Sequence, residues 1–192
     1  MDKGLYKFLK WTAILLAVAW IGWSIYDSMI APRRPGDLDY LEANNLFEDG
    51  EYQRALDRYD EALKEDPDHL HAMRGRARSL MQLRRSPQAL TVFNTAISLE
   101  PDFGPTYANR GILHDRMGRY EKAVEDYERA LALDPELTEG PHWLTRFLRN
   151  QPQKPPGIAE RAAYLRKELA KPEGERVLRV PDLDAEQRSY KQ

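Results

Sequence analysis

Three prolines recur at a fixed interval in the middle of the chain, and this repeat constrains the fold more than any other feature. Pro67, Pro101 and Pro135 stand 34 residues apart. Aromatic residues lie eight positions before each proline, and alanines lie five and twelve positions before it. These columns are Tyr59, Phe93 and Tyr127; Ala62, Ala96 and Ala130; and Ala55, Ala89 and Ala123. Such a period predicts stacked helix pairs, which present a surface rather than enclose a pocket.

Small residues form a further column near the start of each repeat: Ala43, Ala77 and Gly111. They let two helices approach closely, while the aromatic column fills the space between neighbouring pairs. Each proline ends a second helix, because proline disfavours helical geometry in the preceding residue. Gly50 and Gly118 lie at the turn within a pair, where the middle repeat has Arg84, so that turn is predicted to form without glycine.

The repeat resembles the tetratricopeptide repeat. The stretches 50–67, 86–101 and 107–135 follow that pattern, and the resemblance covers about half of the chain. It implies an all-α array of helical hairpins, here three repeats plus a capping helix, behind an N-terminal transmembrane helix. The single-span tetratricopeptide proteins of bacterial envelopes share this layout. The fold alone does not select a function, because it serves many unrelated partners.

Two positions depart from the family pattern. Asp39 stands where the family has an aromatic residue, and His114 interrupts a column that Leu46 and Leu80 form. Some family members grip the C-terminal carboxylate of a chaperone with a lysine, asparagine and arginine clamp. At those positions only Asn44 fits, and the other four hold Tyr40, Gly75, Pro105 and Asn109. A carboxylate-clamp co-chaperone is therefore disfavoured.

Periodicity and composition divide the chain into successive segments. We predict an N-terminal tail (1–10), a transmembrane helix (11–30), a linker (31–36), three repeats over 37–137 (about 36–69, 70–103 and 104–137), a half-repeat or capping helix (138–150), a proline-rich linker (151–157), a C-terminal helix (158–171) and an extended or disordered tail (172–192). The C-terminal helix is predicted to cap the stack, because its apolar residues share one side. These residues are Ile158, Ala162, Leu165 and Leu169.

Residues 11–30 are predicted to cross a membrane once. The run from Trp11 to Tyr26 has no charge and is apolar on all sides. It rises about 24 Å as a helix, and the residues up to Ala31 extend it toward a hydrocarbon core of ~30 Å. A cleaved signal peptide is the alternative, with a cleavage site at 17–19. We favour an uncleaved anchor, because few apolar residues precede that site and apolar sequence continues beyond it.

The charges flanking this segment favour a cytoplasmic N-terminus by a slim majority. Lys3, Lys7 and Lys10 precede the segment, and Arg33 and Arg34 follow it. Basic residues gather on the cytoplasmic side, so in a bacterium the repeats would lie in the periplasm. The opposite orientation, with cytoplasmic repeats, stays open.

Composition excludes several kinds of chemistry. With 29 basic and 31 acidic residues the net charge is −2, so no electrostatic preference for nucleic acid follows. The chain has no cysteine, which rules out disulfides and thiolate metal sites. The histidines form no catalytic or metal-ligating constellation; they are His69, His71, His114 and His142. We therefore expect no enzymatic activity, no cofactor and no metal.

The family resemblance places the first helix of each pair on a concave wall that binds partners. The residues predicted to bind a partner there are Tyr40, Asn44, Phe47, Arg74, Arg78, Met81, Asn109, Ile112, Arg116 and Arg146. Arg74 and Arg78 are four residues apart and share a helical face. With Arg116 and Arg146 they are predicted to form a basic strip suited to an extended or helical peptide with acidic groups.

Alternatives stay open for this wall. In one alternative the arginines have no role in binding. They are then either solvated, as charges on helix faces usually are, or paired with Glu48 and Asp115 in the same groove. The segment 176–180 has enough β-branched character to dock as a strand in the groove of its own or another copy.

Taken together, these features predict a membrane-anchored adaptor that binds a protein or peptide and assists the assembly or maturation of envelope proteins. The alternative is a constitutive subunit of a membrane complex, held through its transmembrane helix. The partner and the oligomeric state are not specified by the sequence.

Overall fold

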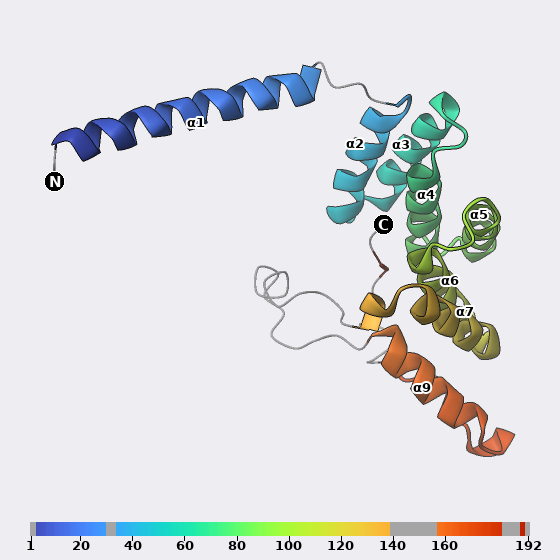
Figure 1. Cartoon of the computed structure of the whole chain (residues 1–192). Helices are drawn as coiled ribbons and strands as arrows, with labels where there is room; N and C mark the ends of the chain where they lie inside the picture. The colour runs from blue at the N-terminus through green and yellow to red at the C-terminus, as the bar shows by residue number, and fades with distance from the viewer. Residues whose placement is uncertain (1–2, 30–33, 139–156, 182–188, 191–192) are drawn as a thin grey trace. The chain divides into compact units, whose positions relative to one another are not determined.

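The computed structural model describes residues 3–29, 34–138, 157–181 and 189–190, and it is helical (Figure 1). These residues form eight α-helices and two short 3-10 helices, with no strand among them. The chain divides into two compact units, Met1–Arg34 and Pro35–Gln192. Of the predicted half-repeat at 138–150, only Thr138 is among the described residues.

The first unit consists of one long helix, α1 (Lys3–Met29). Its 27 residues would rise about 40 Å, more than a hydrocarbon core requires. The stretch Gly4–Asp27 is long and apolar enough to cross a membrane, and none of its apolar core is buried within the protein. Trp11, Trp20 and Trp23 are each more than 60% exposed, so protein packing does not cover this apolar surface.

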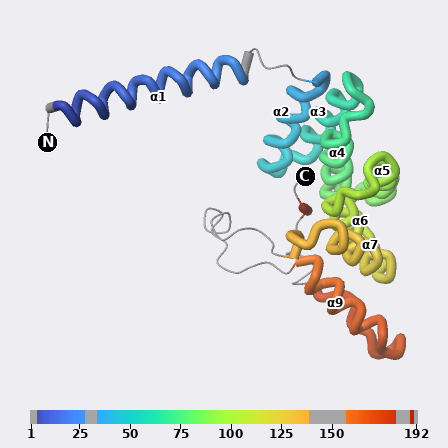
Figure 2. The backbone as a smooth tube through the Cα atoms, viewed as in Figure 1, coloured from blue at the N-terminus to red at the C-terminus, as the bar shows by residue number. Residues whose placement is uncertain are grey.

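The second unit is a series of helical hairpins that follow one another in chain order (Figure 2). Its elements are α2 (Asp37–Glu48), α3 (Tyr52–Glu65), α4 (Leu70–Gln82), α5 (Ser86–Leu99), α6 (Gly104–Arg116), α7 (Tyr120–Leu133), η1 (Pro135–Thr138), α9 (Ile158–Leu169) and η2 (Glu173–Glu175). Within each pair the helices pack together, and α3 also contacts α4 as α5 contacts α6. The predicted all-α array of three hairpins is confirmed.

The turns within the hairpins require a left-handed residue, and the sequence supplies it in two ways. Gly50 and Gly118 have φ values of 81° and 72°, which cost glycine little. Arg84 occupies the same place in the middle repeat with φ 59°. Its N–H donates to the carbonyl of Met81, as the N–H of Gly50 does to Phe47. As predicted, the middle turn forms without glycine.

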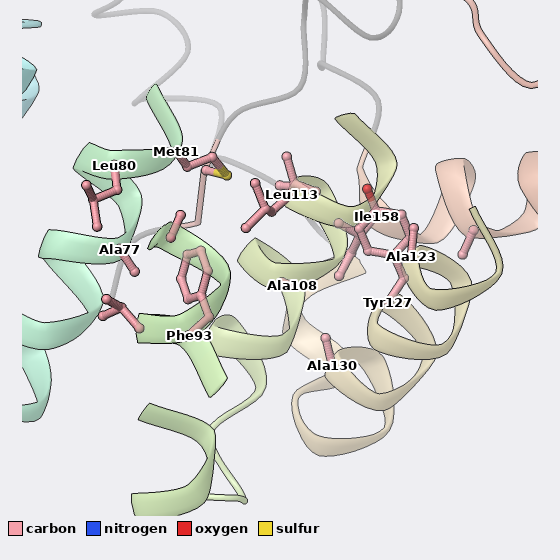
Figure 3. Packing of buried hydrophobic residues seen from close by; sticks show 14 of the residues in the cluster. Ala77, Leu80, Met81, Phe93, Ala108, Leu113, Ala123, Tyr127, Ala130 and Ile158 are labelled. Atoms are coloured by element: carbon pink, nitrogen blue, oxygen red, sulfur yellow. The ribbon is translucent and has the colours of Figure 1, made fainter. Parts of the chain in front are cut away.

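The repeated columns form two core clusters, one with the first-repeat residues Ala55, Tyr59 and Ala62 and one with column residues of the second and third repeats. Figure 3 shows the second of these clusters. Tyr59, Phe93 and Tyr127 have no exposed side-chain surface. Gly111 is needed opposite Tyr127, because a Cβ at this position would come within 2.7 Å of the ring. A methyl group there would displace the aromatic side chain that fills the gap between α6 and α7.

The C-terminal helix closes the stack. Helix α9 packs against α7, and its side chains Ile158, Ala162 and Leu165 are buried in the same core as the last two repeats. Figure 3 shows Ile158 beside Ala123 and Tyr127 of α7. The array therefore ends in a helix from beyond the repeats, as predicted from its apolar side.

Candidate functional site

The first helices of the three hairpins form one wall, because α2 contacts α4 and α4 contacts α6. We call the side chains on these three helices the first-helix wall. Nine of the ten predicted partner-binding residues lie on it, and Arg146 falls outside the described residues. Their surroundings differ strongly from one repeat to the next.

Arg74 is buried, with 1% of its surface exposed. Its guanidinium carbon lies 3.9 Å from the ring centroid of Phe103, and an Nη atom donates to the carboxylate of Glu100 at the end of α5. The buried Nε has no hydrogen-bond partner. The partner of Arg74 is thus Glu100, directly after α5, rather than Glu48 or Asp115, and the Arg74 guanidinium group is not exposed to solvent.

Arg78, one turn further along α4, is also buried. It stacks on Phe47 of α2, with 4.1 Å from its guanidinium carbon to the ring centroid, and its Nε has no hydrogen-bond partner. Burial lowers the pKa of Arg78, while the nearby Tyr59 and Glu48 oppose this shift. Cation–π contact with an aromatic face partly replaces the lost hydration.

These positions change the interpretation of the predicted basic strip. Arg74 and Arg78 do share a helical face, but both guanidinium groups are packed on aromatic rings. Only Arg116 of the described strip residues is exposed, and it donates to Gln82 over 3.4 Å. The sequence could not reveal this burial, because the stacking partners come from another helix and from an inter-repeat turn.

An aromatic group gathers where the first two hairpins meet. The ring of Tyr40 lies 5.0 Å from that of His69 and 6.0 Å from that of His71. His69 accepts from the N–H of Ala72 and lies 3.1 Å from Asp37, so it caps α4 and links it to α2. Two residues that are two positions apart within a helix would point to different faces. His69 lies before the first turn of α4, so both histidine rings can lie near the ring of Tyr40.

Asn44 is held in a fixed orientation beside this group. The hydroxyl of Tyr59 donates to its Oδ1 over 2.7 Å, which leaves the Asn44 amide nitrogen as the donor end. Met81 and Ile112, also predicted to bind a partner, are almost completely buried in the core. Whether these residues contact a partner stays a prediction.

In the third repeat, Asp115 connects the wall to the capping helix. Arg161 of α9 donates from two nitrogens to the two oxygens of Asp115 over 2.7 and 2.8 Å. The hydroxyl of Tyr127 donates to the same carboxylate, and Arg161 also donates to the carbonyl of Leu178. All the charged atoms of the pair lie in a buried region, so this link depends on its geometry.

The segment 176–180 docks on α9. The hydroxyl of Tyr164 donates to the carbonyl of Val177, whose N–H donates to Glu168. Leu178 packs against the main core. The strand-like segment therefore lies on the capping helix of its own chain rather than in the groove between repeats.

Asn109 of α6 is fully buried and holds a different part of the C-terminal region. Its amide hydrogen-bonds both backbone atoms of Tyr190, with 2.8 Å between the Tyr190 nitrogen and Oδ1 and 3.1 Å between Nδ2 and the carbonyl oxygen. No sequence pattern indicated this contact, which joins residues 81 positions apart.

A cavity of about 730 Å³ opens elsewhere, between α3, α4 and α5. Acidic side chains of α3 line one side of it, and Asp60 there pairs with Arg76 over 2.5 Å. The part of the chain that the structure describes contains no group of three or more side chains suited to a metal ion.

A stack of three helical hairpins, with one wall built from the first helices and a capping helix at its end, defines a helical-repeat binding protein. Residues 40–108 and 105–137 match two models that are both described as tetratricopeptide repeat. Through residues 40–137, which make up about half of its length, the chain belongs to the tetratricopeptide repeat family.

Similar curated proteins include chaperone-associated proteins of eukaryotes. The chain is 37% identical over 103 residues to a DnaJ homolog subfamily C member 7 homolog of Dictyostelium discoideum. It is 32% identical over 98 residues to Hsp70-Hsp90 organizing protein 3 of Arabidopsis thaliana. Each match covers 51% of this chain but only 19% and 18% of the respective relative, so the likeness concerns the repeats.

A solved structure with a bound peptide is also similar. The first tetratricopeptide domain of Spaghetti (RPAP3), bound to the HSP90 peptide SRMEEVD, matches 67% of this chain and 94% of its own. The TM-score is 0.53 at 26% identity. A bacterial structure, MamA from Desulfovibrio magneticus, shares the fold with a TM-score of 0.51 and 23% identity.

Proposed function

We propose that this chain is a non-enzymatic, membrane-anchored adaptor whose first-helix wall binds an extended segment of a partner protein. The family and the peptide-bound relative support a protein-binding role. The observation that carries the proposal is the Asn109 contact, because its amide pairs with the backbone of an extended segment as a neighbouring strand would. A wall fixed by packing loses little entropy when a segment binds.

We propose that the wall does not recognise its partner through a terminal carboxylate. The positions of the family's carboxylate clamp hold Tyr40, Asn44, Gly75, Pro105 and Asn109, of which none is cationic. Tyr40, which is partly exposed, offers aromatic surface on the same wall. We propose that the adaptor recognises an internal extended segment through its backbone and apolar side chains.

The anchor determines where this adaptor works. Helix α1 has the length and apolar character for one membrane span, which supports an anchor. We propose that its N-terminus is cytoplasmic and that, in a bacterium, the repeats lie in the periplasm and assist the assembly or maturation of envelope proteins. Confinement to the membrane surface raises the effective concentration of the array for partners in that membrane.

Site-specific photocrosslinking tests this proposal in native membranes. A photoreactive residue replaces His71 on α4 or Arg116 on α6 in the full chain, and Arg54 on α3 or Thr91 on α5 in matched controls; all four are exposed. We expect the same partner to crosslink from the first two positions and not from the controls. Crosslinks from α3 and α5 alone would place the partner on the opposite helices and refute the proposal.

Removal of residues 1–30 separates the adaptor from a constitutive subunit. The unit Pro35–Gln192 is compact by itself, so the repeats are expected to stay folded without α1. An adaptor still captures the crosslinked partner in this form. If only the full chain retains the partner, the protein is a subunit held through its transmembrane helix.

A further inference from the structure

Residue 190 is bound to the third repeat through its backbone. Asn109 is fully buried, and its side-chain amide both accepts from the N–H of Tyr190 and donates to its carbonyl. This pairing satisfies both backbone groups of one extended residue and would accept any residue type except proline, which has no N–H to donate. It therefore recognises extended polypeptide as such.

The side chain of Tyr190 is read separately. Its hydroxyl accepts from the N–H of Ile158 over 3.2 Å, at the first residue of α9. This N–H belongs to the helix terminus, where backbone donors have no partner within the helix. The ring packs against the main core, and burial raises the pKa of the phenol. A phenylalanine in this place would fill the same space but leave the N–H of Ile158 without its acceptor.

These two contacts come from helices that a buried ion pair holds together. Asn109 and Asp115 both belong to α6, and Arg161 and Ile158 both belong to α9. Because Arg161 pairs with Asp115, the side-chain amide of Asn109 and the backbone N–H of Ile158 keep a fixed spacing. The two helices thus hold the site in place, and Tyr190 makes three hydrogen bonds with these described helices.

We propose that Asn109, the N-terminus of α9 and the apolar surface between them form a tyrosine-binding site for extended protein segments. Tyr190 is its resident occupant, and a tyrosine-containing segment of a partner protein replaces it. This inference rests on the proposed function, because the replacing segment belongs to the protein that the first-helix wall binds. The segment around Tyr190 then sets a minimum affinity for the partner, because a partner binds this site only if it displaces a ligand that is tethered to the same chain.

A labelled peptide tests the site directly. The probe is a fluorescein-labelled hexapeptide with the sequence of residues 187–192, titrated by fluorescence anisotropy into the full chain in detergent micelles. We expect saturable binding to Tyr190→Ala that is at least ~10-fold tighter than binding to the wild type, where the tethered segment competes. Equal affinity for both proteins would overturn the proposal.

Changes in the peptide provide a control that leaves the protein unaltered. Replacement of its tyrosine by phenylalanine should weaken binding to Tyr190→Ala about 5-fold through loss of one hydrogen bond. Replacement by alanine should abolish measurable binding. A peptide with alanine that binds as tightly as the tyrosine peptide refutes tyrosine recognition.

Hydrogen exchange on the unmodified protein gives a second measurement. The amide of Tyr190 should exchange slowly, because Oδ1 of Asn109 accepts its hydrogen bond, and excess unlabelled peptide should accelerate that exchange. Unchanged exchange in saturating peptide would overturn the inference. Photocrosslinking at His71 tests the adaptor function independently of this result. If the peptide displaces Tyr190 but no partner crosslinks from His71, the adaptor function alone is contradicted.

Discussion

Arg84 shows how one residue carries strain that its counterparts in the other repeats avoid. Gly50 and Gly118 adopt positive φ without cost, but an arginine with φ 59° places its Cβ against the backbone. The repeat tolerates this strain because the flanking hydrogen bonds to Met81 and Leu80 fix the turn. The first and third repeats show which residue the turn favours.

Substitution Arg84→Gly should stabilise the protein by about 1 kcal/mol, which is the cost of left-handed geometry for a residue with a Cβ. In a domain of this size the melting temperature should rise by a few degrees. Thermal unfolding followed by circular dichroism measures the change. Arg84→Ala removes the same side chain but retains the strain, so it should give no such gain; equal gains would assign the effect to charge.

His114 is the other residue that departs from its column. It is buried where the earlier repeats have leucine, and its Nδ1 has no hydrogen-bond partner. Burial lowers the pKa of His114, with Asp126 opposing the shift and Arg110 adding to it. Neutral histidine is therefore the form that the fold accepts.

His114 should make the stability depend on pH. The unfolded chain takes up a proton at this histidine near pH 6.5, whereas the folded chain does so only at lower pH. The unfolded state therefore binds more protons at this site in that interval, so the contribution of His114 to the free energy of unfolding is fully present above about pH 6.5 and is lost as the pH falls toward the folded pKa. Urea titrations at several pH values should show this slope.

His114→Leu should remove this part of the slope and raise stability by about 1 kcal/mol, because no buried nitrogen is left without a partner. His114→Gln should remove the same slope without that gain, since the site stays polar. If His114→Leu retains the full pH dependence, other groups cause it.

At the scale of elements, the docking of α9 depends on one buried ion pair. Arg161 of α9 pairs with Asp115, and it also donates a hydrogen bond to the carbonyl of Leu178. The same arginine thus fastens both the capping helix and the segment that follows it. Apolar burial of Ile158 and Leu165 and the exposed pair of Arg166 with Glu128 add further contacts.

Arg161→Met should destabilise the docking of α9 by about 3 kcal/mol, because it leaves the Asp115 carboxylate buried without its counter-ion. Hydrogen exchange should accelerate over residues 158–169 more than in α4 or α5. Arg166→Ala is the matched control: its pair with Glu128 is exposed and worth at most about 1 kcal/mol. Equal effects of both changes would show that the buried pair has no special role.

The repeated elements could be predicted from the sequence, whereas the contacts beyond them could not. Pro67 and its counterparts predict the helix ends, and the aromatic column predicts the core, because each hairpin packs on its neighbour in the same way. The pairs Asp115–Arg161 and Asn109–Tyr190 occur once and join residues 46 and 81 positions apart, so no period reports them. The stacking of Arg78 on Phe47 could not be predicted either, because helical periodicity tells which residues share a face of one helix but not which residue of another helix covers them.

At the scale of the whole molecule, the two units have different requirements for solvent. Helix α1 exposes its apolar side chains along its described length, while the apolar columns of the repeats are buried. We therefore expect only the first unit to require a membrane or detergent.

A chain that begins at Pro35 should be soluble without detergent and unfold at the same urea concentration as the full chain in micelles. Its hairpins and cap contain the whole core of the second unit. Sedimentation and urea denaturation measure these properties. Aggregation of the shortened chain, or a much lower midpoint, would show that the repeats require α1.

The number of hairpins fixes the length of what can lie along them. Neighbouring packed helices are about 8–10 Å apart, so three first helices span roughly 16–20 Å from the first axis to the last. An extended chain advances about 3.3 Å per residue, which gives a footprint of about five or six residues. Because α9 packs on the last hairpin, no further hairpin extends the wall there, and we expect the bound segment of the proposed partner to be short.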